Sequence, residues 1–581
     1  MTASPPVSAS SEGPLVAAAA ARGVATWYET TGRRRVDIDP EVVRAVVALL
    51  EPRTAGAAPV APRVALPEVP RTWGWMIQLY GVRSAASWGV GDFADLAAFA
   101  RWAAQTGAGA VLVNPLHAVA PVGAMPASPY SPSSRRFVNP LYLRIADLPE
   151  YRSADADVQA RVDALRPPSG PPDALIDYDT VWRAKRAALE LLFTDVPEPF
   201  EPAEPALRDF ATYTALAEAH GVDWRTWPED LRRPGPAAYA AADPQRVAFH
   251  ARLQRRCAEQ LAAANAAAAG MAVGIVHDLA VGIDPAGADA WTLQDVIAAG
   301  ARVGAPPDAF NQQGQDWGLA TWRPDRLAAT NYAAYRSLLR GIFAHAGGLR
   351  VDHVAGLWRL WWIPPGHGAA QGAYVHYDDE AMLGVLLEEA IRAGAVVVGE
   401  DLGTVEPVVT RTLQERNILG SAVLWFTRDD DGAFVPPSRW PPNAVASIST
   451  HDLPTATGFL TGEHVRARDA AGVLTRPVGQ EQAAAEQDRA ALLALLAAEG
   501  LATRDSTDAE IVVAMHRLLT RTPCRILLAS PYDVLGEPRQ PNLPGTTAQY
   551  PNWRIPLPLH LEDLTADPRM RQIAELLRDE S

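Results

Sequence analysis

The chain has 581 residues, of which 48% are hydrophobic and 20% charged, a composition typical of a globular protein with a large core. Asp and Glu outnumber Lys and Arg by 67 to 52, and the net charge of −15 gives no positive field to attract nucleic acid or an anionic membrane surface. Two cysteines, Cys257 and Cys524, are too few for a disulfide framework or a thiolate zinc site. The first residues show no basic segment followed by an apolar stretch, so no signal peptide is expected, and no apolar run reaches the about 20 residues of a membrane span. We therefore expect a cytoplasmic protein with neither a membrane nor a nucleic-acid partner.

The first 70 residues are predicted to form a small N-terminal helical module, residues 1–51, and a linker, residues 52–70. Asp39 is a suitable N-cap, Pro40 occupies the first helical position, and an apolar stripe follows over residues 42–50. The linker carries five prolines with Ala and Arg between them, which favours extended backbone over packed structure.

Residues 71–581 are predicted to form the catalytic unit, in which short, uniformly apolar segments alternate with helical stretches. Such segments are typical of parallel strands covered on both faces. The helix between the first two is capped by Asp92 and ends near Gly107. The predicted strands are Trp75–Leu79, Ala110–Val113, Ala272–Val276, Leu349–Val351, Ala395–Val398, Ala422–Phe426, Val445–Ile448 and Ile526–Ala529. Eight largely parallel strands indicate an α/β protein with a (β/α)8 TIM barrel.

A plain barrel of this kind needs about 250 residues, so the long intervals between some strands must be insertions. We place insertions at about residues 117–270 and 453–522. Their Ala- and Leu-rich patterns predict helices over Trp182–Phe193, Leu207–His220, Ala241–Ala268 and Gln480–Gly500.

Acidic residues follow four of the predicted strands: Asp278, Asp352, Glu400 and Asp452. The carboxyl ends of barrel strands converge on one mouth, so acids far apart in the sequence can meet there. Arg350 stands two residues before Asp352 and therefore faces the same side of its strand. The four acids together indicate an active site.

Two chemistries could use such a mouth. A metal-dependent hydrolase would need several histidines at ligand spacing, whereas the first strand has no His-x-His and no cysteine ligands are available. Paired carboxylates beside many aromatic residues instead favour glycoside chemistry, in which one carboxylate attacks the anomeric carbon and another protonates the leaving oxygen. The 17 tryptophans fit stacking on sugars, and metal chemistry stays the alternative.

Several motifs resemble those of the 4-α-glucanotransferases, also called amylomaltases or disproportionating enzymes, glycoside hydrolase family 77 in the α-amylase clan. Their order matches from about residue 73 to residue 554. They are Ser128–Ser131 with Asn139–Leu141, Gly314–Gly318, Gly348–His353 with Leu357–Pro364, Val398–Thr404 and Ser449–Thr455.

The resemblance implies that Asp352 is the nucleophile, Glu400 the general acid/base and Asp452 a third carboxylate that holds sugar hydroxyls. It implies that Arg350 orients Asp352 and lowers its pKa, and that residues 306–318 form a lid. The implied substrate-binding residues are Tyr130, Asp278, Trp317, Arg350 and His451. The implied reaction transfers α-1,4-glucan segments between maltooligosaccharides or starch-like glucans and glucose, with retention and without a cofactor or metal.

A retaining α-glucan hydrolase of the same clan would share the three acids and is the alternative activity. The presence of all three acids disfavours a catalytically silent glucan-binding protein.

Overall fold

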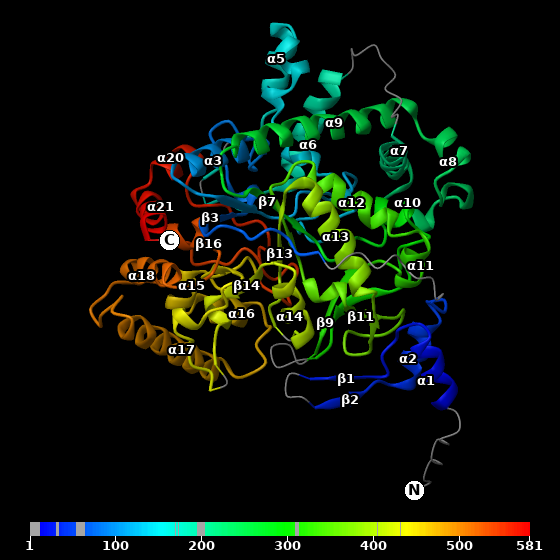
Figure 1. Cartoon of the computed structure of the whole chain (residues 1–581). Helices are drawn as coiled ribbons and strands as arrows, with labels where there is room; N and C mark the ends of the chain where they lie inside the picture. Colours follow the sequence, from blue (N-terminus) through cyan, green and yellow to red (C-terminus); the bar gives the residue numbers. More distant parts are fainter. Residues whose placement is uncertain are drawn as a thin grey trace.

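Eight parallel strands surround the centre of the molecule in the computed structural model (Figure 1), which describes residues 12–30, 34–53, 64–168, 170, 171, 173–193, 204–307, 313–403, 405–429 and 431–580. In sheet order they are β13 (Val396–Gly399), β10 (Gly348–Val351), β7 (Gly274–Leu279), β4 (Ala110–Val113), β3 (Thr72–Ile77), β16 (Ile526–Ala529), β15 (Ala444–Ser447) and β14 (Gly420–Val423). The barrel closes where the Gly399 amide donates to the Leu419 carbonyl at 2.7 Å and the Leu419 amide donates to the Val397 carbonyl at 3.0 Å. The predicted fold class is confirmed.

The bounds of some strands differ from the sequence prediction. β4 and β16 have the predicted bounds, whereas β7 continues to Leu279, three residues beyond its predicted end. His277 and Asp278 therefore belong to the strand itself and do not follow it. β14 ends at Val423, because Leu424–Phe426 turns into a short 3-10 helix.

Helices alternate with the strands around the barrel. α3 shows why they form: Asp92 and Asp95 make a reciprocal capping box at its start, and its apolar face buries Leu96 and Phe99. The ring of Phe99 meets Trp75 of β3 edge-on at 6.3 Å, and burying one such side chain stabilises the fold by about 1.5–3 kcal/mol. The alternating helices are α3 (Phe93–Gln105), α9 (Pro244–Ala267), α12 (Ala333–Phe343), α13 (Asp379–Ala393), α14 (Pro407–Glu415), α18 (Asp508–Thr520) and α21 (Pro568–Glu580).

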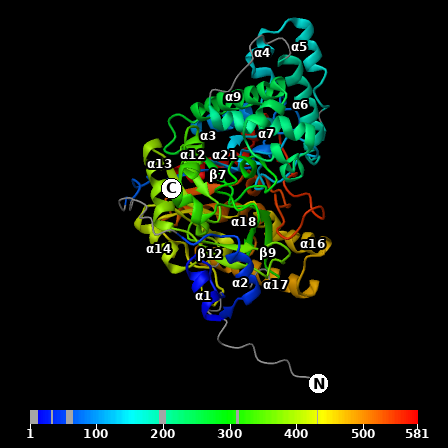
Figure 2. The same cartoon turned by 90° about the vertical axis from the view of Figure 1, so that its right-hand side faces the viewer.

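The described residues between β4 and α9 are mainly helical, and helices α5 and α6 among them lie in the upper part of Figures 1 and 2. Their elements are β5 (His117–Ala118), β6 (Ser134–Val138), α4 (Pro149–Ser153), α5 (Ala156–Asp163), α6 (Tyr178–Phe193), α7 (Pro205–His220) and α8 (Pro236–Ala241).

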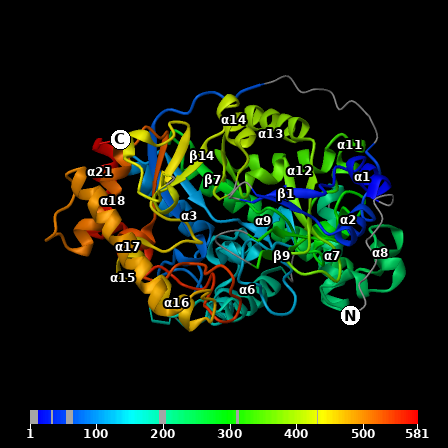
Figure 3. The ribbon, with the colours of Figure 1, turned by 90° about the horizontal axis from the view of Figure 1, so that it is seen from below.

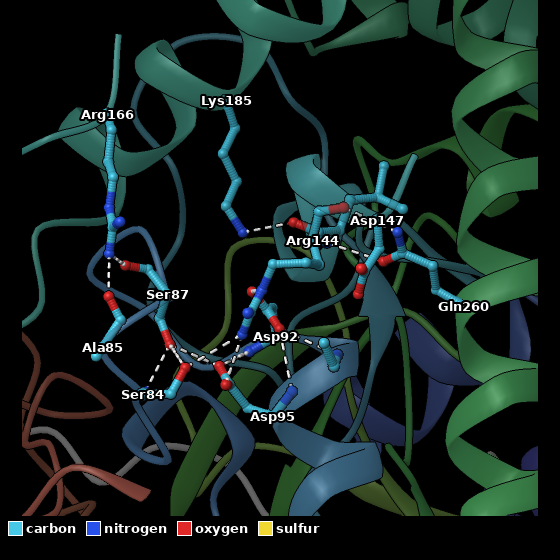
Figure 4. Close-up of polar contacts among 12 residues, drawn as sticks. Ser84, Ala85, Ser87, Asp92, Asp95, Arg144, Asp147, Arg166, Lys185 and Gln260 are labelled. Atoms are coloured by element: carbon cyan, nitrogen blue, oxygen red, sulfur yellow. Dashed lines mark hydrogen bonds and ion pairs between the residues drawn. The ribbon is translucent and has the colours of Figure 1, made fainter. Parts of the chain in front are cut away.

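A buried cluster of charges fastens this region to the barrel (Figure 4). Arg144 pairs with both capping acids of α3, with Asp92 and, at 2.6 Å, with Asp95. Burial raises the pKa of Asp92 to about 6 and lowers the pKa of Lys185 to about 8. Lys185, the one lysine of the sequence, is fully buried and donates to the carbonyls of Leu141 and Leu143 at 2.6 and 2.8 Å.

A four-stranded antiparallel sheet, which the sequence analysis did not foresee, is built from the segments that follow β7 and β10. Its order is β12 (Ala373–His376), β11 (Arg359–Ile363), β8 (Arg302–Ala305) and β9 (Gln315–Leu319). The short helices α10 (Ala288–Thr292) and α11 (Pro324–Ala329) flank β8 and β9 in the chain. Because these segments leave the carboxyl ends of two neighbouring barrel strands, the sheet lies beside the barrel mouth.

The N-terminal residues pack on this sheet. Helices α1 (Glu12–Ala20) and α2 (Pro40–Val47) flank a hairpin of β1 (Trp27–Glu29) and β2 (Arg35–Asp37), whereas the sequence predicted only helix. The Ala25 amide donates to the Tyr374 carbonyl and the His376 amide to the Gly23 carbonyl, both at 2.8 Å, so this segment extends the sheet at β12. Within the predicted linker, residues 64–70 have no helix or strand, and residues 54–63 lie outside the described part of the chain.

The predicted second insertion contains the helices α15 (Ala456–Thr461), α16 (Glu463–Ala470) and α17 (Val478–Ala498). These helices and the N-terminal segment lie on opposite sides of the barrel (Figure 3). The remaining helices, α19 (Pro531–Leu535) and α20 (Leu561–Ala566), precede α21. Over the described ranges, no helix is both long and apolar enough to cross a membrane.

Replacing Arg144 by Gln should destabilise the protein by about 3–5 kcal/mol, because Asp92 and Asp95 would remain buried without their ion-pair partner. The measurement is the denaturant midpoint of the first unfolding transition. Arg152→Gln is the matched control: its ion pair with Asp147 is exposed, and its loss should change the stability by about 1 kcal/mol or less. Equal effects of the two substitutions would contradict the structural role of the cluster.

Candidate active site

The barrel brings the predicted site residues together at the carboxyl ends of its strands. Arg350 lies on β10 opposite Asp278 of β7 in the parallel register, and Asp352 directly follows β10. Glu400 directly follows β13, while His451 and Asp452 come four and five residues after β15. Residues that span almost 180 positions in the sequence thus meet at one mouth.

Arg350 is the electrostatic centre of this group. Its Nη1 donates to both oxygens of Asp278 at 2.7 Å and to Oδ1 of Asp352 at 3.0 Å. The Asp278 side chain is only 4% exposed and the Asp352 side chain 21%. Two carboxylates this close need a cation between them, which Arg350 supplies.

The charge of Arg350 lowers the pKa of Asp352, as expected, but the pKa is raised overall. Burial raises the pKa, and the attraction of Arg350 offsets this only in part, because Glu400 adds a repulsion in the same direction as burial. Burial also raises the pKa of Asp278, which shares the same guanidinium.

Tyr130 connects Asp278 to a second charged pair. Its hydroxyl donates to Oδ2 of Asp278 at 2.7 Å and lies 3.3 Å from Nδ1 of His451. Nε2 of His451 is 3.3 Å from Oδ2 of Asp452. Burial by itself would lower the pKa of His451, but the Asp452 carboxylate outweighs it, so the pKa is raised and favours the imidazolium. A continuous chain of polar contacts therefore runs from Asp352 to Asp452.

Glu400 is fixed by backbone donors. The amide of His353 donates to its Oε2 at 2.9 Å and the amide of Leu402 to its Oε1 at 2.8 Å. His353 has the left-handed φ of +46°, which is uncommon for a residue with a side chain. This conformation turns the chain just after Asp352 and brings its amide to Glu400, so the backbone couples the positions of the two acids.

Trp317 also reaches this region. It lies on β9, and its half-buried ring meets the ring of His353 edge-on at 5.4 Å. Its Nε1 donates to Oε1 of Gln315 at 3.1 Å. The predicted lid, residues 306–318, thus includes part of the antiparallel sheet, and residues 308–312 lie outside the described part of the chain.

Two residues near the site were missed by the sequence analysis. Nδ2 of Asn542 donates to Oδ1 of Asp452 at 2.7 Å, and Trp553 packs its ring against Tyr130 and His451. The pKa of Asp452 is lowered, because the charge of His451 and the hydrogen bonds from His451 and Asn542 together outweigh burial. Both residues come from the irregular segment after β16, where no hydrophobic periodicity or acidic strand end could draw attention to them.

No group of three or more His, Cys, Asp or Glu side chains is arranged to hold a metal ion among the residues that the structure describes. What the site offers is a cluster of carboxylates around a buried arginine, beside aromatic rings. On a barrel, this arrangement defines an enzyme that acts on glycosidic bonds.

Comparison with known proteins identifies which glycoside chemistry this is. The family model for 4-alpha-glucanotransferases, glycoside hydrolase family 77, matches residues 77–561, so the chain belongs to that family. The 4-alpha-glucanotransferase of Mycobacterium tuberculosis (strain ATCC 25618 / H37Rv) is 49% identical over 87% of this chain and 75% of its own length. That of Haemophilus influenzae is 34% identical over 87% and 77%.

A solved structure agrees with the sequence relatives. The amylomaltase from Corynebacterium glutamicum superposes with a TM-score of 0.85 over 97% of this chain and 99% of its own, at 29% identity. The amylomaltase from Streptococcus agalactiae, solved with acarbose, has the same fold at a TM-score of 0.71 and 18% identity over 87% of this chain and 98% of its own. The chain is therefore an enzyme that transfers α-1,4-glucan segments, and the hydrolase and metal alternatives are set aside.

Replacing Arg350 by Gln should move the acid limb of the kcat/KM profile upward by about 1–3 pH units. The arginine charge lowers the pKa of Asp352, so its loss raises that pKa further and Asp352 ionises only at higher pH. The measurement is residual transfer activity as a function of pH. Arg340→Gln, which breaks an ion pair with Glu389 on the outer helices, should leave the limb in place. An unmoved limb in Arg350→Gln would contradict the coupling.

Proposed function

We propose that Asp352, Glu400 and Asp452 perform the glucan transfer by a retaining double displacement. The observation that carries this proposal is the chain of contacts that joins Asp352, Arg350, Asp278, Tyr130, His451 and Asp452 around one barrel mouth. Glu400 stands beside it on the neighbouring strand, held by two backbone amides.

In the first half of the reaction, the Asp352 carboxylate attacks the anomeric carbon of the donor glucan. Glu400 gives its proton to the glycosidic oxygen, the bond to the leaving glucan breaks, and a glucosyl ester of Asp352 forms. In the second half, Glu400 takes the proton from the 4-hydroxyl of an acceptor glucan or glucose. That oxygen displaces Asp352, and two inversions give net retention.

The remaining residues bind and orient the sugar. Asp452 accepts from sugar hydroxyls, its charge balanced by His451 and its orientation fixed by Asn542. The Tyr130 ring offers a stacking surface, and Arg350 with Asp278 keeps Asp352 aligned. We propose maltooligosaccharides and starch- or glycogen-like glucans as substrates, glucose as an acceptor, and the cytoplasm as the location.

Maltotriose as sole substrate should give glucose and a ladder of longer chains with little gain in reducing ends, because each cleavage is matched by a new bond. Chromatography of the products and a reducing-end assay check this. If the products are only glucose and maltose, with reducing ends rising in step, the proposed transfer reaction is wrong.

Asp352→Asn should lower the rate by at least about 10³-fold while glucan binding survives. Asp378→Asn should leave the rate unchanged, because Asp378 is an exposed N-cap that Asn replaces well.

Trp317→Ala should raise the share of hydrolysis relative to transfer. An acceptor held against an apolar ring can reach effective molarities of about 10⁵ M or more and outcompete water for the glucosyl ester. The ratio of new reducing ends to transfer products measures this share. Trp27→Ala, which removes an exposed ring from the N-terminal hairpin, is the matched control and should not change the ratio. If both variants behave like the unmodified protein, Trp317 does not hold the acceptor.

A further inference from the structure

Three aromatic rings from distant parts of the chain pack against one another beside the carboxylates. Tyr130 comes from the segment between β5 and β6, His451 from the loop after β15, and Trp553 from the segment after β16. The ring centroids are 4.8 Å apart for Tyr130 and His451, 5.3 Å for Tyr130 and Trp553, and 5.2 Å for His451 and Trp553. Trp553 is 6% exposed, so its own ring is buried where it packs against the other two.

The backbone at Trp553 is held in an unfavourable conformation. Its φ is +62°, in the left-handed region that bulky residues rarely adopt. Two contacts enforce it: the Trp553 amide donates to the Pro541 carbonyl at 2.8 Å, and the Tyr178 hydroxyl donates to the Trp553 carbonyl at 2.5 Å. Strain of this kind persists only where the surroundings enforce it, and it occurs often at functional sites.

The same segment contacts the His451–Asp452 pair at a second point. The Asn542 amide donates to the His451 carbonyl at 2.9 Å, and the Asn542 side chain donates to Asp452. Asn552 ties the two ends of the segment together, since its Oδ1 accepts from the Leu543 amide at 2.7 Å. The segment thus contacts this pair in three ways: a backbone hydrogen bond to His451, a side-chain hydrogen bond to Asp452, and the packing of the Trp553 ring against the ring of His451.

We propose that Trp553 is a positioning residue for the transfer reaction, acting through the rings of Tyr130 and His451. The inference rests on the roles proposed above for those two residues and for Asp452. The Tyr130 hydroxyl contacts both Asp278 and His451, and His451 in turn contacts Asp452. These contacts persist only while the rings of Tyr130 and His451 keep their positions and orientations. A displacement of about 1 Å of the groups that position a substrate can lower the rate about 100-fold. Trp553 supplies the rigid surface that prevents this displacement.

The test is a double-mutant cycle on maltotriose disproportionation. Trp553→Ala should lower kcat by at least about tenfold and change KM by less than about threefold, because the rings matter most when the sugar is distorted at the reacting centre. Trp553→Phe, which retains an aromatic face, should restore most of the rate. In a Tyr130→Ala background, the further loss from Trp553→Ala should fall below about threefold, since the Tyr130 hydroxyl that joins Asp278 to His451 is already gone.

Trp440→Ala is the matched control, because Trp440 is equally buried but lies before β15, at the opposite end of the barrel strand. Trp440→Ala should lower thermal stability without changing kcat per folded molecule. In the Tyr130→Ala background it should likewise leave kcat per folded molecule at the value of Tyr130→Ala alone. A full tenfold loss from Trp553→Ala in the Tyr130→Ala background would overturn the proposal. A loss explained by the unfolded fraction alone would also overturn it. Either result leaves the roles of Asp352 and Glu400 intact, whereas undiminished transfer by Asp352→Asn would refute the proposed function whatever Trp553 does.

Discussion

The site depends on one buried cation, the guanidinium of Arg350, between Asp278 and Asp352. Without it, the two largely buried carboxylates would repel each other, and one would take up a proton. Taking one partner out of such a buried group leaves an uncompensated charge, which is far more costly than losing an exposed pair. The parallel register of β7 and β10 places Arg350 opposite Asp278, so the barrel itself sets this balance.

From Arg350 the polar contacts extend outward through segments that are remote in the chain. Tyr130 belongs to the first inserted region, and Asn542 and Trp553 belong to the segment after β16. The buried cluster of Arg144, Asp92 and Asp95 fixes that inserted region to the barrel at another point. The cluster therefore anchors to the barrel the same region that contains Tyr130.

The antiparallel sheet and the N-terminal segment serve the other side of the mouth. β9 carries Trp317 to the ring of His353, the residue after Asp352. The N-terminal residues extend this sheet at β12 and bury Tyr28 against Trp361 at 5.2 Å. They thus support the sheet that carries Trp317, while the barrel strands carry the carboxylates and Arg350. The division into module, linker and catalytic unit stays a prediction.

The sequence by itself indicated the barrel, because eight short apolar segments that alternate with helical stretches are typical of parallel strands covered on both faces. It also determined the main acids, because a barrel brings its strand ends to one mouth whatever lies between them. It could not show the antiparallel sheet, since residues 357–364 contain tryptophans buried by distant partners and lack the alternation of a half-exposed strand. Nor could it show that burial outweighs Arg350 at Asp352, since a pKa depends on what surrounds the group in space. Asn542 and Trp553 lie in irregular backbone without a periodic pattern, so only the tertiary structure, which folds that segment onto His451 and Asp452, decided their place in the site.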